Sequence, residues 1–257
     1  MDILSRAGRY CLGATVAASG LMQVITAAFV RLVPKLPEWV PVQPGLAIAT
    51  GMLLILIGGA ILTGYKIRVA AIGLAALLLG SFIFQRIPEI VANPGAGFMW
   101  TNPAKVLALF GGTLLVAGGT GRVVMLAAGL LGVFLLICGA QHFTYAGFVD
   151  TLVPAWIPPG PRFWTYFSAV ALLAGGLGVV IPPTRKLAGI LSGVMIFLWV
   201  LMLHIPLALK MHNAFELAGT LEALALAGVC WLVAGNSLGT MQNGSATPAR
   251  TAEPAPR

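Results

Sequence analysis

The amino-acid sequence predicts an all-α, polytopic membrane protein with eight transmembrane helices in two tandem, parallel four-helix units. Its 257 residues are 59% hydrophobic and only 9% charged, whereas a soluble domain carries about 25% charged residues. Apolar runs of roughly 20 residues, the length that crosses a bilayer, recur along the chain. Several sequence landmarks also return at a fixed spacing. Together these observations indicate membrane helices and an internal repeat.

The apolar runs are bounded by proline, charge or short polar breaks, and each is long enough to span with some tilt. Because lipid offers no partner to backbone polar groups, helices are the spanning element to expect. The run from Cys11 to Val30 is longer than a signal-peptide core of about 7–15 residues, so we expect a first membrane helix there. The predicted spans are 11–30, 45–64, 69–86, 104–120, 123–141, 163–181, 187–205 and 217–235.

The internal repeat appears when the chain is shifted by 117 residues. The shift brings together pairs of matching landmarks, namely Trp39-Val40-Pro41 with Trp156-Ile157-Pro158, Gly58-Gly59 with Gly175-Gly176, Arg68 with Arg185, and Leu114–Gly118 with Trp231–Gly235. Four helices per unit is an even number, so both units share one orientation in the membrane. The predicted organisation is a first unit over residues 1–121, a second unit over 122–236, and a polar, Pro-rich disordered cytoplasmic tail over 237–257.

Charge asymmetry predicts the orientation. The side with both termini carries nine Lys and Arg residues against two acidic ones, and the other side carries six against five. The positive-inside rule therefore places both termini in the cytoplasm, and we expect a multi-pass protein of the inner (plasma) membrane. The net charge of +8 fits this bias, and no basic patch with interleaved aromatics predicts nucleic-acid binding. The longer loops, 31–44, 87–103, 142–162 and 206–216, fall on the outer side.

Residues suited to proton chemistry gather at the outer ends of the second unit. His142 and His204 end two predicted helices, and Glu222 lies inside the last one. An imidazole beside a carboxylate can accept, relay or donate protons near neutral pH, so these three are the candidate catalytic residues. The first unit has Gln23, Arg86 and Lys105 at the matching places.

Arg86, Lys105 and Trp156 are the candidate ligand-binding residues. Each candidate also has a structural interpretation. Lys105 and Glu222 could pair across the two units, and the histidines could hold helix ends through loop carbonyls. The glycine pairs in mid-helix indicate close helix contacts. No HExxH or similar spacing is present, so we predict no metal site.

The second unit resembles the DoxX/DoxD-like membrane proteins. The resemblance rests on Gln141-His142-Phe143, on Val153–Pro158, on the Gly-Gly pair that follows, and on His204-Ile205-Pro206. It covers residues 123–235 best, and residues 11–120 are similar to a degenerate second copy. The resemblance implies a small inner-membrane protein, related to a subunit of thiosulfate:quinone oxidoreductase or to partners of secreted redox-defence proteins. Many members have one unit, and this chain has two.

The leading hypothesis is a DoxX-like membrane protein that supports electron transfer or quinone-linked redox chemistry at the outer face. His142 and His204 would bind or deprotonate a quinol, Glu222 would pass the proton, and Lys105 and Arg86 would favour an anionic donor or product. A quinone is the expected cofactor, with none bound covalently. The lipid bilayer and a periplasmic redox protein are the expected partners. Two alternatives stay open, a non-enzymatic scaffold for a periplasmic partner and a small-solute transporter that uses the cleft between the units.

Overall fold

The computed structural model describes residues 2–29, 43–95 and 97–237, and this part of the chain is helical without any strand. The long helices are α1 (Ile3–Thr26), α2 (Gln43–Thr63), α3 (Ile67–Ser81), α5 (Thr101–Val116), α6 (Arg122–Thr144), α8 (Pro161–Val180), α9 (Pro182–Trp199) and α11 (Ala214–Asn236). Shorter segments join them, namely the π-helices η1 (Phe82–Arg86) and η3 (Val200–His204), the 3₁₀ helix η2 (Gly97–Trp100), and helices α4 (Ile87–Ala92), α7 (Ala146–Leu152) and α10 (Ile205–Met211).

Six of the helical segments in the described chain are long and apolar enough to cross a membrane. They are α2, residues 67–92, α6, α8, residues 182–211, and α11. Each of the eight predicted runs does contain a helix, but α1 and α5 are not among the six. Helix α5 has 16 residues and is short for a bilayer core of about 30 Å, and α1 carries Arg6, Arg9 and several hydroxyl side chains. The protein is therefore helical and suited to a membrane, with six candidate spans in the described residues.

Two of the predicted helix ends are wrong. We expected the third and seventh runs to stop at 86 and 205, before Pro88 and Pro206, but the helices continue to Ala92 and Met211. Proline removes a backbone donor and clashes with the carbonyl four residues earlier. In both places a π-helix directly precedes the Ile-Pro pair, and its wider turn accommodates the proline without ending the helix. The outer loops after these helices are correspondingly shorter than predicted.

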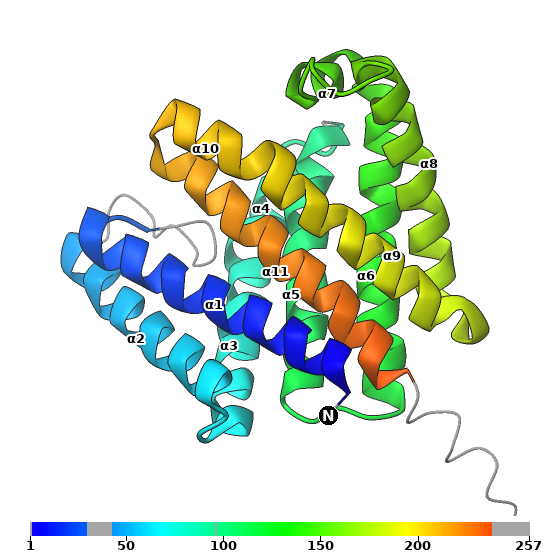
Figure 1. Ribbon diagram of the computed structural model, residues 1–257. Helices are drawn as coiled ribbons and strands as arrows, with labels where there is room; N and C mark the ends of the chain where they lie inside the picture. The colour runs from blue at the N-terminus through cyan, green and yellow to red at the C-terminus, as the bar shows by residue number, and fades with distance from the viewer. Residues whose placement is uncertain (1, 30–42, 96, 238–257) are drawn as a thin grey trace, which may run out of the picture.

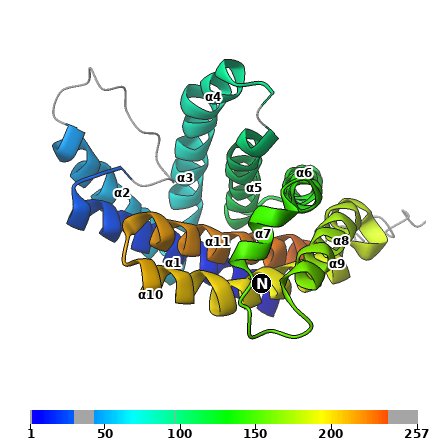
Figure 2. The same ribbon diagram turned by 90° about the horizontal axis from the view of Figure 1, so that it is seen from above.

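Helix α11 occupies the centre of the bundle. It packs against α1, α9 and α5, and α6 packs against α5 and α8 (Figures 1 and 2). Helix α11 is also the most buried of the six candidate spanning segments. The N-terminal end of α1 lies beside the C-terminal end of α11, where the amide of Asn236 donates to Ser5 Oγ over 3.4 Å. One face of the bundle therefore carries the start of α1, the end of α11 and the connections at 64–66, 117–121 and 181 (Figure 1).

The mid-helix glycines allow close helix contacts, as their sequence context predicts. A Cβ on Gly58 would lie 2.4 Å from the backbone nitrogen of Ala17, so α2 touches the α1 backbone at this point. In the second half of the chain, a Cβ on Gly176 would lie 3.0 Å from the backbone oxygen of Gly132 on α6. One glycine of each pair therefore brings two helices to backbone distance.

Two predicted features fall outside the described residues. One is most of the first outer loop, including Trp39 and its basic neighbours Arg31 and Lys35. The other is the tail from residue 238 onward.

Candidate functional site

A long apolar groove of about 980 Å³ lies between α8 and α9. The two helices meet at their connection near residue 181 and diverge from there toward their opposite ends (Figure 1). Side chains of α8 and α9 line most of the groove, α6 contributes His142, η3 contributes His204, and α7 with the segment after it contributes Val149, Leu152, Val153, Pro154 and Ile157. The groove therefore has one end with two imidazoles and a long apolar remainder.

His142 is held by its own helix and by one aromatic ring. Its Nδ1 lies 2.7 Å from the carbonyl oxygen of Cys138, one turn earlier in α6. A carbonyl oxygen can only accept, so Nδ1 carries the proton and Nε2 remains as an acceptor. The ring also stacks on Trp199, with centroids 6.0 Å apart and planes 18° from parallel. Both residues line the groove, so the imidazole is fixed in orientation with one nitrogen available.

His204 ends the π-helix η3 and lines the same groove. The side chain of Thr220 on α11 donates to the backbone carbonyl of His204 over 3.2 Å, which ties the π-helix to the central helix. The described part of the chain gives the His204 ring no hydrogen-bond partner. Sequence reasoning had predicted both histidines but could not show that one groove joins them.

Trp199 is the residue that sequence reasoning missed. It lies five residues before His204, stacks on His142, and lines the groove together with both histidines. The available signal was its position inside an apolar run, because membrane tryptophans are usually found at the interfaces.

Lys105 and Glu222 form an ion pair between α5 and α11. Lys105 Nζ lies 2.6 Å from Glu222 Oε2, and only 15% and 9% of the two side chains are exposed. Lys105 also lies 3.4 Å from Asn102 Oδ1. The structural interpretation of these two residues is thus confirmed, because they pair across the middle of the bundle. Neither of them lines the groove.

The other two candidate ligand-binding residues lie elsewhere. Arg86 is buried on η1 and pairs with Glu89 within its own helix, with Nη1 and Oε2 2.8 Å apart. Trp156 is 71% exposed and is not among the described groove residues, although its neighbour Ile157 is. The structure therefore brings together His142 and His204, pairs Glu222 with Lys105, and leaves Arg86 and Trp156 outside this arrangement.

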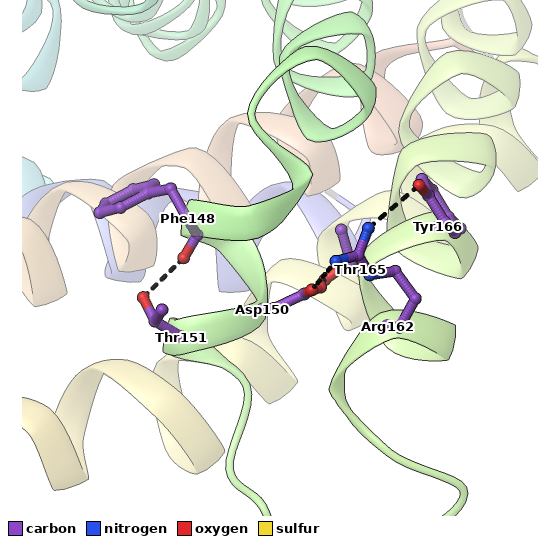
Figure 3. A network of polar contacts seen from close by, with 6 residues as sticks. All are labelled: Phe148, Asp150, Thr151, Arg162, Thr165 and Tyr166. Carbon is purple, nitrogen blue, oxygen red and sulfur yellow. Dashed lines mark hydrogen bonds and ion pairs between the residues drawn. The ribbon is translucent and has the colours of Figure 1, made fainter.

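Helix α7 lies at the end of the groove that contains the two imidazoles, and it is anchored to α8 by one aspartate (Figure 3). Asp150 accepts a hydrogen bond from Thr165 Oγ1 over 2.7 Å and pairs with Arg162 at 2.7 Å. Arg162 in turn donates to the Tyr166 hydroxyl over 3.3 Å. The Asp150 side chain is thus used to position α7 above the two imidazoles.

The described residues contain no group of three or more His, Cys, Asp or Glu side chains that could hold a metal ion. The three cysteines, Cys11, Cys138 and Cys230, are free thiols within helices α1, α6 and α11.

Comparison with known proteins gives one match. A family model described as a domain of unknown function (DUF8561) matches residues 131–231, a region that contains the groove, both histidines and Glu222 but not Lys105. No curated protein and no solved structure matches the chain. These comparisons leave the resemblance to DoxX proteins as a prediction.

Proposed function

We propose that this chain binds a quinone in the groove between α8 and α9 and supports quinone-linked redox chemistry at the outer face of the membrane. The supporting observation is a pair of imidazoles at one end of an otherwise apolar, membrane-embedded groove. Ligand sites have this character, with apolar walls and a few polar groups that fix orientation. A quinone matches it, because an apolar ring carries two oxygens that accept hydrogen bonds or, in the quinol, donate them.

His142 is the proposed proton-transfer residue. Its unprotonated Nε2 can accept the proton of a quinol hydroxyl, and the resulting imidazolium can return a proton to a quinone oxygen. Reduction of a quinone takes up two electrons and two protons. In this proposal a periplasmic redox protein supplies the electrons, and the protons enter from the outer face through His142 and His204. The chain's own part is to bind, orient and protonate the head group.

Glu222 is the proposed next group in the proton path, and its ion pair with Lys105 limits how it acts. Protonating Glu222 would leave the Lys105 ammonium without its counter-charge in a poorly solvated place, which is costly. A proton would therefore pass through Glu222 briefly rather than reside there. Because Lys105 and Arg86 both have carboxylate partners, the anion-binding role expected for them has no support from their contacts.

We also propose that the fold consists of two four-helix units with both termini in the cytoplasm, in a DoxX-like arrangement. Three contact patterns support this. Helices α1 and α2 pack together as α6 and α8 do, α3 and α5 pack as α9 and α11 do, and α1 packs on α11 as α6 does on α5. Each half also contains one π-helix before an Ile-Pro pair. A reporter fused at Asn243 should read out on the cytoplasmic side, and a periplasmic readout would reverse the orientation.

The test replaces each groove histidine by glutamine, the residue that the first half carries at the place of His142. Membranes from cells that produce the wild type should reduce a decyl-substituted benzoquinone faster than membranes that lack it. His142→Gln should lower this added rate by about 100-fold or more, the usual scale for loss of an acid–base group, and His204→Gln should lower it too. His212→Gln is the matched control, because His212 is exposed and outside the groove. Equal rates in all variants would refute the proposal.

A further inference from the structure

The groove extends far beyond the two histidines, and its shape defines the rest of the ligand. We infer that the α8–α9 groove holds the tail of a single-chain lipid, an amphiphile with an uncharged head at the histidines and one long isoprenoid or alkyl chain. The assignment of the head as a quinone rests on the proposed function. The inference about the hydrocarbon tail of the ligand rests on the lining, length and width of the groove.

The lining indicates an uncharged head group. Among the described residues around the groove there is no Asp, Glu, Lys or Arg. A phosphate head would need cationic partners in such a place. Two cations near this end are engaged, since Lys105 pairs with Glu222 and Arg162 pairs with Asp150. A carbonyl or hydroxyl head that hydrogen-bonds to neutral imidazoles fits this end, and a phospholipid head does not.

The length of the groove indicates a long chain. Its lining runs from Leu152 and Pro154, above the histidines, to Ile181 and Thr184 at the opposite connection. The groove thus follows the whole of α8, whose 20 residues correspond to about 30 Å at about 1.5 Å per residue. A ligand with its head at His142 and His204 would place its chain across the depth of the bilayer.

The width of the groove indicates one chain rather than two. Near the connection the two helices touch, because a Cβ on Gly175 would lie 2.3 Å from Ser192 Oγ and one on Gly178 would lie 2.7 Å from the Ala188 Cβ. Toward this connection the floor of the groove therefore consists of small side chains, and the space above it narrows to a crease. Leu177, Leu187 and Leu191 stand exposed along its rim. A chain can reach the crease sideways from the surrounding lipid.

The experiment narrows the crease without touching the histidines. Ala171 is half-buried in the groove floor, whereas its neighbour Val170 is 59% exposed and lies outside the groove. The variants are Ala171→Phe, the milder Ala171→Leu, and the matched control Val170→Phe. Each protein, in nanodiscs of one lipid composition, is titrated with a benzoquinone that bears a decyl chain and with the same ring without a chain. Binding is followed by quenching of tryptophan fluorescence.

We expect Ala171→Phe to weaken binding of the decyl probe about tenfold, because the new ring displaces several methylene groups of the chain. Ala171→Leu should have a smaller effect of the same kind and preserves the test if the larger residue prevents folding. In the Ala171 variants, binding of the ring without a chain should change less than about twofold. Val170→Phe should leave the binding of both probes unchanged. Since every protein sits in the same lipid, partition of the probes into the bilayer cancels.

Two outcomes would overturn the inference, namely unchanged binding of the decyl probe in both Ala171 variants, or equal weakening of both probes. Failure of the proposed function looks different. In that case His142→Gln would bind both probes as the wild type does, while the Ala171 variants would still discriminate against the chain. Farnesol, which carries a chain on a hydroxyl head, serves as competitor. Its displacement of the decyl probe in the wild type but not in Ala171→Phe would support the single-chain site.

Discussion

The two halves of the chain place polar side chains at matching positions but use them differently. In the first half, the Gln23 amide donates to the Ala47 carbonyl over 2.8 Å and to Thr50 Oγ1 over 2.5 Å, both on α2. In the second half, the one hydrogen bond of the His142 ring in the described structure stays within α6. An amide that bonds to the neighbouring helix is structural, whereas an imidazole bonded at one nitrogen keeps the other for a ligand.

The two π-helices show the same contrast. On η1, Arg86 is buried and forms an ion pair with Glu89 three residues later. On η3, His204 occupies the matching place, faces the groove, and has no hydrogen bond to its ring within the described chain. A π-helix therefore carries an arginine that is ion-paired within its own helix in one half, and an imidazole that faces the groove in the other. This comparison supports the proposal that the first half has a structural role and that the second half binds the ligand.

The largest expected effect comes from breaking the ion pair that joins the two halves. Lys105→Met would remove the ammonium group that pairs with the largely buried Glu222 carboxylate, and we expect a loss of about 3–5 kcal/mol in the free energy of unfolding. The double variant Lys105→Met/Glu222→Met should recover most of this loss, because replacing both charges by apolar groups is often neutral. The free energy of unfolding of both variants is measured in detergent. A double variant as unstable as the single one would show that the pair is not the origin of the loss.

Smaller changes in stability are expected for Gln23→Ala and His142→Ala, and the two variants should differ in quinone binding. The first change removes two interhelical hydrogen bonds, each worth about 0.6–1.7 kcal/mol in membrane proteins, so we expect about 1–2 kcal/mol of destabilisation and normal quinone binding. The second removes a hydrogen bond within one helix, and it should cost less stability but abolish quinone binding. The measurements are unfolding in detergent and probe titration. If Gln23→Ala impaired binding as strongly as His142→Ala, the division of roles between the halves would be wrong.

The smallest expected effect is on the anchoring of α7. Asp150→Asn weakens the contacts to Arg162 and Thr165, and because Arg162 is largely exposed the change in global stability should be slight. We expect instead faster proteolysis in the segment after α7, residues 153–159, measured as a cleavage half-life in detergent. Thr151→Val is the control, because the Thr151 hydroxyl bonds only to the Phe148 carbonyl within the described α7. Equal half-lives for both variants would mean that Asp150 does not anchor this helix.

Much of the fold follows from local properties that a sequence displays directly. Apolar length predicts membrane helices because the bilayer core has a set thickness and offers no backbone hydrogen bonds. The repeat spacing of 117 residues placed Lys105 opposite Glu222, and these two residues do pair, 117 positions apart. Pro88 and Pro206 misled the prediction of helix ends because a proline signals a break, and only the backbone around it determines whether a π-helix absorbs it.

The sequence by itself determined that this protein is helical and suited to a membrane, and it predicted His142 and His204 as candidate site residues. Only the tertiary structure decided that they face one groove, that Trp199 stacks on His142, and that Arg86 and Trp156 lie elsewhere. The physical reason is the distance along the sequence over which each property is set. Burial of an apolar run depends on consecutive residues, whereas a groove depends on how two helices diverge, which is set by contacts such as Gly175 with Ser192 between helices.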